Sequence, residues 1–207
     1  MKTVPNSPLP LALVVTLGAV TSLAAGQSNF KTLYSFTNGV PQSLVSSNGG
    51  FIGAFGGVGA SGSDCGAVFQ LLPPAVQGGD WSEAAVYSFS GAGQGPCAPD
   101  FGPAIGSDGA LYGLTTRGGT YGGGTLYMLE APDSAGGAWT ATVLYSFGAA
   151  GTHDAPGGGG LIPGPGGSYY FPSFGGGAYG YGALVQMQPP AVPGGGWTAS
   201  VLYSFPN

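Results

Sequence analysis

The chain has 207 residues, of which only 5% are charged, and its formal net charge at pH 7 is −5. Proteins that bind nucleic acid normally carry a basic stripe, and an anionic membrane surface also attracts basic residues, so this balance disfavours both partners. The 44 glycines and 18 prolines would suggest disorder in a chain without a period. However, 12% of the residues are aromatic, and this content argues for a packed core.

Residues 1–26 have the pattern of a secretory signal peptide. Lys2 supplies a positive start, Leu11–Val20 an apolar run, and Ser22–Ala24 the small residues of a cleavage site. The apolar run is shorter than the roughly 20 residues that a membrane-spanning helix needs. We therefore expect export to the periplasm, the cell surface or the medium, and a mature chain, 27–207, without a membrane span. An uncleaved membrane anchor is the alternative.

A nine-residue motif recurs along the chain at a nearly fixed spacing. Its most regular copy reads Trp139-Thr-Ala-Thr-Val-Leu-Tyr-Ser-Phe147, and it returns at Trp197–Phe205 and, less perfectly, at Trp81–Phe89. A shortened copy lies at Phe30–Phe36. The motif tyrosines are 53, 58 and 58 residues apart in chain order. A period of this kind indicates a repeat architecture.

Alternation of side chains within the motif indicates a β-strand, because successive residues of a strand point to opposite faces. One face would carry Trp139, Ala141, Val143, Tyr145 and Phe147, and the other Thr140, Thr142, Leu144 and Ser146. We expect the aromatic face to be buried in every copy. Replacing Tyr145 by alanine should then destabilise the fold by about 3 kcal/mol or more.

The repeat predicts an all-β, propeller-like domain of three four-stranded units, preceded by an extra N-terminal strand at Asn29–Phe36. The units span about 37–89, 90–147 and 148–205, and the expected strands of the middle unit are Pro103–Ile105, Ala110–Thr116, Thr125–Glu130 and Trp139–Phe147. Four antiparallel strands in about 50 residues fit a propeller blade. Closed propellers have about four to eight blades. The alternatives for three units are therefore an open wedge, a ring of two chains, or a fragment of a longer array.

The best-matching segments of the middle unit are Leu111-Tyr-Gly-Leu-Thr-Thr, Gly118-Gly-Thr-Tyr-Gly-Gly-Gly-Thr-Leu-Tyr and Val143-Leu-Tyr-Ser-Phe. They resemble the GloVer tandem-repeat proteins, which are exported bacterial proteins with varied surface anchors. The resemblance covers nearly the whole mature chain. It implies export and a β-propeller-like repeat, and it assigns no catalytic or ligand residue. The first and third units depart from the family pattern at Phe51-Ile-Gly-Ala-Phe and Tyr169-Tyr-Phe-Pro-Ser-Phe.

Strand direction alternates in an antiparallel unit, so the loops between second and third strands share one rim with the connections between units. The candidate ligand-binding residues of this rim are Arg117, Tyr121, Tyr179, Tyr181, Asp100, His153 and Asp154. Aromatic rings beside glycine backbone and a few carboxylates suit sugar rings, which have apolar faces and many hydroxyls. A carbohydrate or a cell-surface component is thus the expected ligand. The alternative is that the tyrosines only cover neighbouring loops and that the histidine is a solvated loop residue.

Cys65 and Cys97 fall on the same rim. In an exported protein two cysteines most simply form a disulfide, which here would tie the first unit to the second. Free thiols and an intermolecular bridge are the alternatives. No metal site or cofactor is expected, because one histidine and scattered carboxylates lack the usual ligand spacing.

Patterns that carry catalysis are weak. The chain has no Gly-x-Ser-x-Gly turn for a serine nucleophile. A glycosidase needs two carboxyl groups in one cleft, and the close pairs are Asp80 with Glu83 and Glu130 with Asp133. The third unit has Gln188 and Ala191 in the positions of the second pair. We predict a binding or surface-structural module. The alternatives are a polysaccharide hydrolase or lyase and a purely structural module that self-assembles, for example as a homo-oligomer.

Overall fold

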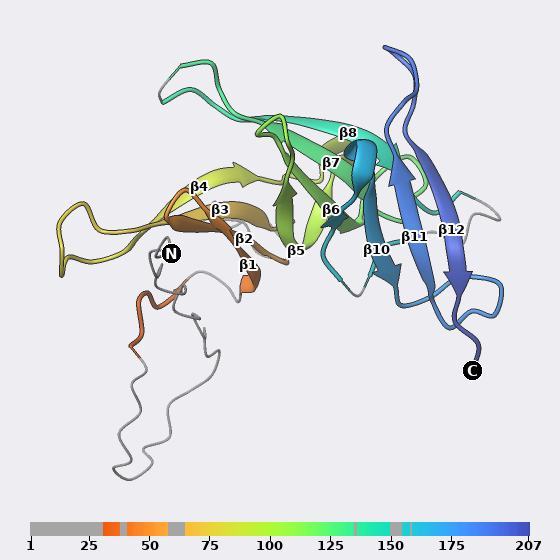
Figure 1. The fold of residues 1–207 in the computed structure, drawn as a ribbon, viewed down its shortest axis with the longest axis horizontal. Helices are drawn as coiled ribbons and strands as arrows, with labels where there is room; N and C mark the ends of the chain where they lie inside the picture. The colour runs from red at the N-terminus through yellow and green to blue at the C-terminus, as the bar shows by residue number, and fades with distance from the viewer. Residues whose placement is uncertain (1–30, 38–40, 58–64, 135, 150–154, 158) are drawn as a thin grey trace, which may run out of the picture.

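The computed structural model describes residues 31–37, 41–57, 65–134, 136–149, 155–157 and 159–207. Within these ranges the chain forms twelve β-strands in three four-stranded antiparallel sheets, with two short 3-10 turns. The prediction of an all-β fold with three four-stranded units is therefore confirmed. Figure 1 shows the sheets following one another across the molecule, from orange and yellow through green to blue. They form an open series and do not close into a ring.

Each sheet consists of four strands that are consecutive in the chain and hydrogen-bonded in chain order. The first sheet holds β1 (Pro41–Ser47), β2 (Gly50–Phe55), β3 (Ala67–Leu72) and β4 (Ser82–Ser88). The second holds β5 (Cys97–Ile105), β6 (Leu111–Arg117), β7 (Thr125–Glu130) and β8 (Thr140–Ser146). The third holds β9 (Ile162–Pro163), β10 (Tyr169–Ser173), β11 (Ala183–Gln188) and β12 (Thr198–Ser204). The 3-10 turns are η1 (Ala92–Gln94), before β5, and η2 (Pro165–Gly167), between β9 and β10.

The same backbone turn closes the hairpin between the third and fourth strands of every sheet. Its hydrogen bond is 3.1 Å long in all three, from the amides of Gly79, Gly137 and Gly195 to the carbonyls of Val76, Ser134 and Val192. The glycine before each donor has a φ of 84°, 82° or 79°, at Gly78, Gly136 and Gly194. Glycine adopts positive φ without a steric penalty, so the repeated glycine pairs of the sequence follow from this turn.

A β-bulge interrupts the fourth strand of each sheet. In the second sheet Leu126 pairs with Tyr145, whereas the next residue of β7, Tyr127, pairs with Val143. Leu144 is therefore the extra residue of the bulge. A bulge of this kind breaks the strict alternation of faces along the strand that carries it.

The bulge makes the predicted single face from Trp139 to Phe147 wrong. Trp139 and Ala141, before the bulge, pack toward the first sheet. Leu144, Tyr145 and Phe147, at and after the bulge, pack toward the third sheet. The fourth strand thus contributes side chains to the cores on both sides of its sheet.

Two hydrophobic cores hold the sheets face to face. The core between the first and second sheets contains Ile52, Ala54, Val68, Phe89, Leu111, Tyr127 and Leu129. The core between the second and third sheets includes Tyr112, Leu114, Leu126, Phe147, Tyr169, Phe171, Val185 and Met187. A third cluster, Phe55, Ala67, Phe69 and Leu71, covers the opposite face of the first sheet. Burial of apolar area between sheets is the main stabilising contribution to such a stack.

The predicted N-terminal strand is not formed in the described part of its segment, because residues 31–36 have no strand pairing. Tyr34 and Phe36 instead lay their rings on the third cluster. The ring centroid of Phe36 is 5.6 Å from that of Phe55 and 5.2 Å from that of Phe69. The segment therefore contributes the side chains of its motif without the strand. Phe30 and the predicted signal, 1–26, lie outside the described residues.

Candidate functional site

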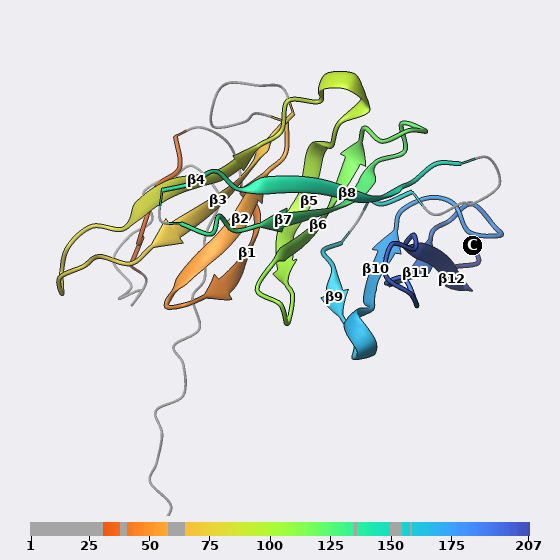
Figure 2. The ribbon, with the colours of Figure 1, turned by 90° about the horizontal axis from the view of Figure 1, so that it is seen from above.

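The predicted rim is formed by loops that hydrogen bonds attach to the sheets. Figure 2 shows η1 and the β6–β7 loop at the same end of the second sheet. The Gly119 amide of this loop donates to the Gln94 carbonyl at 2.8 Å, and the Thr120 amide donates to Ser146 Oγ at 3.2 Å. In the third sheet the Ala178 amide donates to Ser204 Oγ at 2.9 Å. The serine of the repeated motif thus anchors the loop in both sheets.

Buried hydroxyl groups fix the base of the same loops. Thr125 donates its amide to Thr115 Oγ1 at 3.0 Å, and the two hydroxyl oxygens are 2.8 Å apart. In the third sheet the Ala183 amide donates to Ser173 Oγ at 3.0 Å. A loop that is ordered before binding loses less conformational entropy when a ligand arrives. These bonds therefore favour a preformed binding surface.

The loops present four exposed aromatic side chains. They are Tyr121 on the β6–β7 loop and Phe174, Tyr179 and Tyr181 on the β10–β11 loop, each between 56% and 80% exposed. The three tyrosines lie where the sequence placed them. Sequence reasoning missed Phe174, although an aromatic residue at the position of Thr116 in the preceding unit could have indicated it. We call these four residues the aromatic rim.

The charged candidates lie on neighbouring strands of the second sheet. Arg117 is the exposed last residue of β6 and pairs with Cys97 of β5, next to the β6–β7 loop. Asp100 is half-buried on β5, opposite Leu114. His153 and Asp154 lie outside the described residues. The structure thus places Arg117 and Asp100 on one sheet, whereas Tyr179 and Tyr181 belong to the next.

The disulfide predicted between Cys65 and Cys97 is present, with a distance of 4.5 Å between the two Cα atoms. The Ala98 amide also donates to the Cys65 carbonyl at 2.7 Å. Both bonds attach the loop before β3 to the first residues of β5. At this rim, the first sheet is therefore covalently linked to the second.

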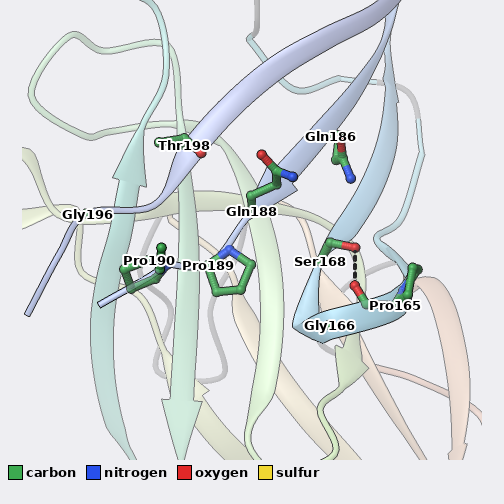
Figure 3. Close-up of a pocket in the computed structure, with 10 residues that line it drawn as sticks. Pro165, Gly166, Ser168, Gln186, Gln188, Pro189, Pro190, Gly196 and Thr198 are labelled. Atoms are coloured by element: carbon green, nitrogen blue, oxygen red, sulfur yellow. Dashed lines mark hydrogen bonds between the residues drawn. The ribbon is translucent and has the colours of Figure 1, made fainter. Parts of the chain in front are cut away.

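A groove of about 610 Å³ lies on the outer face of the third sheet, away from the second sheet (Figure 3). Its lining comes from η2, from β11 and from the β11–β12 hairpin: Pro165, Gly166, Ser168, Gln186, Gln188, Pro189, Pro190, Ala191, Gly196 and Thr198. The Gln186 Nε2 donates to the Tyr170 hydroxyl at 3.0 Å, and Ser168 Oγ donates to the Pro165 carbonyl at 2.7 Å. The groove therefore combines apolar proline walls with neutral amides and hydroxyls.

Sequence reasoning missed this groove, but the repeat carried a signal for it. Gln186 occupies the position of Met128 in the preceding unit, where the residue packs against a core. Replacement of an apolar core residue by a polar one in the next repeat indicates that no sheet covers this face in the later repeat. A second groove of about 540 Å³ lies between the first and second sheets and is lined mainly by residues 84–88 and 136–139.

Within the described residues, the linings of the two grooves contain one ionisable side chain, Tyr87 of the second groove. Neither lining contains a carboxylate, an imidazole, a thiol or a basic group. Asp80, Glu130 and Asp133 of the predicted pairs are exposed near the hairpins between third and fourth strands. No cluster of three or more histidine, cysteine or acidic side chains suited to a metal ion occurs in the part of the chain that the structure describes.

Asp108 has a structural role in the predicted turn before β6. One carboxylate oxygen accepts from the Ala110 amide at 3.1 Å, and the other accepts from the Tyr112 hydroxyl at 2.7 Å. Burial, and then the charge of Asp108, raises the pKa of Tyr169 to about 12. Burial, and then this hydrogen bond, also raises the pKa of Tyr112. Both phenols therefore stay neutral near pH 7.

No family model, curated protein or solved structure matches the chain. Among the described residues, no helix has the length and apolar character needed to cross a bilayer. The features that bear on function are the aromatic rim, the grooves and the packing of the sheets.

Proposed function

We propose that the chain is an exported carbohydrate-binding module built from propeller-like blades. The observation that carries this proposal is the aromatic rim, whose four exposed rings stand on loops anchored by hydrogen bonds. Exposed aromatic rings in a nearly uncharged surface match the apolar faces of sugars, while the glycine-rich backbone offers donors and acceptors to their hydroxyls.

Two features support the propeller-like arrangement. The three four-stranded sheets pack face to face in chain order, as the blades of a propeller do. The motif residues Phe89 and Phe147 contribute to the two cores between sheets. In this proposal the period of the sequence is the period of the blades.

The disulfide and the pattern of residues 1–26 support export. Disulfides form and persist in oxidising compartments such as the periplasm and the extracellular medium. The Cys65–Cys97 bond thus fits a non-cytoplasmic location. The proposed ligand is accordingly a glycan of the cell surface or of the surroundings.

The rival function is a hydrolase or lyase that acts on a polysaccharide. Glycosidase chemistry needs a pair of carboxyl groups on either side of the bond that is cleaved. The linings of both grooves lack such groups, so the geometry favours binding over turnover.

Isothermal titration calorimetry of the purified protein with a panel of soluble polysaccharides tests this proposal. We expect saturable binding without released oligosaccharide, and at least about tenfold weaker binding for Tyr179→Ala/Tyr181→Ala, since burying a large apolar ring face contributes on the order of 1.5–3 kcal/mol. Val192→Ala is the matched control, because Val192 is equally exposed but lies on the β11–β12 hairpin. Binding unchanged in the double variant would exclude the rim, and released oligosaccharide would favour the enzyme.

A further inference from the structure

The four copies of the Tyr-Ser-Phe motif have the same local geometry, whatever their secondary structure. In each copy the tyrosine and phenylalanine rings meet edge to face, with centroids 5.0, 5.1, 4.9 and 5.2 Å apart in chain order. The pairs are Tyr34 with Phe36, Tyr87 with Phe89, Tyr145 with Phe147, and Tyr203 with Phe205. The first copy keeps this geometry although residues 31–36 form no strand.

The first three copies each pack on the sheet that follows them in the chain. Their phenylalanine rings meet a ring of that sheet edge to face: Phe36 with Phe69 at 5.2 Å, Phe89 with Tyr127 at 5.0 Å, and Phe147 with Phe171 at 5.5 Å. We call this contact the joint. The first joint is made by the N-terminal segment, and the other two connect neighbouring sheets.

In each sheet, one aromatic ring accepts the phenylalanine of the joint. This ring is paired across the neighbouring strand with a smaller residue. These pairs are Gly53 with Phe69, Gly113 with Tyr127, and Phe171 with Val185. In the third sheet the large residue has moved to the other strand of the pair. A Cβ on Gly53 or Gly113 would overlap the ring opposite it, so glycine leaves the space that the ring fills. The acceptor of the joint is thus a repeated feature.

The fourth copy has no acceptor among the described residues. Leu202, Tyr203 and Phe205 are 50%, 54% and 41% exposed, whereas Phe89 and Phe147 are 1% and 0% exposed. The difference does not come from the motif, because residues 143–147 and 201–205 have identical sequences. Among the described residues, no further sheet packs against the outer face of the third sheet.

We infer that the outer face of the third sheet docks on the first sheet of a second copy of this chain, head to tail. Tyr203 and Phe205 of one copy then replace Tyr34 and Phe36 on the cluster around Phe69 of the next. The inference extends the two joints between sheets by one more joint of the same kind. It stands independently of glycan binding.

The two surfaces that this contact needs lie at opposite ends of the row of sheets. In Figures 1 and 2 the segment around Tyr34 lies beside the first sheet at the left, and the C-terminus lies beside the third sheet at the right. The Tyr34 phenol is next to the Glu83 carboxylate, and burial, with Glu83 as the second cause, raises its pKa. The Tyr203 hydroxyl of a second copy would meet the same acceptor.

The N-terminal motif is then a plug that limits association. A segment that is joined to its acceptor by a few residues of the same chain competes at an effective concentration on the order of millimolar. A second copy at micromolar concentration therefore rarely displaces it. Removing the aromatic side chains of the plug frees the acceptor and should increase association of the chains. Removing those of the fourth copy takes away the group that docks and should decrease association.

A head-to-tail contact uses two different surfaces, so it produces a ring if the rotation closes and a filament if it does not. Two chains of three sheets would give a six-sheet ring, within the size range of closed propellers. Both products require the fourth copy of the motif. The mass of the product distinguishes them.

Light scattering during size exclusion, over a range of protein concentrations, tests the inference on three variants of the purified protein. We expect Tyr34→Ser/Phe36→Ser to raise the association constant about tenfold or more relative to the parent chain. Tyr203→Ser/Phe205→Ser should remain a single chain at every concentration. Tyr121→Ser/Tyr179→Ser is the matched control, since it removes two exposed tyrosines from the aromatic rim and should associate like the parent.

A synthetic peptide with the sequence of residues 197–207 provides a second measurement that does not depend on the stability of the C-terminal variant. The peptide should bind the plug variant, Tyr34→Ser/Phe36→Ser, at least about tenfold more tightly than it binds the parent. The same peptide with serine at Tyr203 and Phe205 should not bind. A folded plug variant that stays monomeric and ignores the peptide would overturn the inference, as would association that survives loss of Tyr203 and Phe205.

Discussion

Residues 143–147 and 201–205 have the same sequence, but the structure treats them differently. Phe147 is buried between the second and third sheets, whereas Phe205 is exposed on the outer face of the third. Each motif lies on a fourth strand with the same kind of bulge. The sheet that follows the motif therefore decides whether the motif is buried. Amphipathic pattern alone identifies a packing surface but not its partner.

The largest expected effect comes from truncating the two phenylalanines in turn. Phe147→Ala should lower the free energy of unfolding by about 3–5 kcal/mol, because it leaves a cavity in a closed core. Phe205→Ala should lower that of the single chain by less than about 1 kcal/mol, because the ring is already partly in water. Urea unfolding at low protein concentration measures both. Equal losses would show that the two motifs are equivalent and would remove the basis of the comparison.

The two joints that connect sheets differ in that only one of them is reinforced by a disulfide in the described residues. Cys65–Cys97 ties the first sheet to the second, and the described residues contain no such bond between the second and third. Cys65→Ser/Cys97→Ser should lower the free energy of unfolding by about 3–4 kcal/mol, since the bond closes a loop of 32 residues. Hydrogen exchange should show the loss mainly in the first sheet. Loss spread evenly over all three sheets would contradict local pinning.

High pH tests the same joint through Tyr127. Burial raises the pKa of its phenol above the value of about 10 in an unfolded chain, so only the unfolded state ionises just above pH 10. Stability should be constant below about pH 10 and then fall by about 1.4 kcal/mol per pH unit from this residue alone. Thermal melts between pH 8 and 11.5 measure the slope. A slope that Tyr127→Phe does not reduce would assign the loss to other groups.

Tyr127→Phe should give the smallest effect at neutral pH, and in the opposite direction. The Tyr127 hydroxyl is buried without a hydrogen-bond partner among the described residues, and the first sheet has phenylalanine, Phe69, in the corresponding place. Removing the hydroxyl should raise the free energy of unfolding by about 1 kcal/mol, and Phe69→Tyr should lower it by a similar amount. Urea midpoints measure both changes. A destabilised Tyr127→Phe would indicate that the hydroxyl has a partner after all.

Local pattern was sufficient for the fold class and for much of the strand plan. The all-β class, the three four-stranded sheets, the span Thr125–Glu130 and the disulfide are confirmed. These features follow from alternation, from turn glycines and from the redox preference of exported chains. Each is a property of a short stretch or of a residue count.

The errors come from contacts that a strand makes with its neighbours. The bulge at Leu144 arises from pairing with β7, so alternation along the motif could not predict it. The segment at 31–36 has the motif but lacks a strand beside it, and only its rings are used. The groove around Gln186 depends on which sheet face remains uncovered. For the candidate site, the sequence predicted which loops carry the tyrosines, but it did not predict what surrounds each tyrosine.

The serine of the motif links the aromatic rim to the joint. Ser204 accepts the Ala178 amide of the loop that carries Tyr179 and Tyr181, and its neighbours Tyr203 and Phe205 belong to the proposed docking face. This bond is already made in the single chain, so the loop and the strand hold each other in place before any ligand binds. One serine hydroxyl therefore supports both the loop that we propose to bind glycan and the strand that we propose to dock on a second copy.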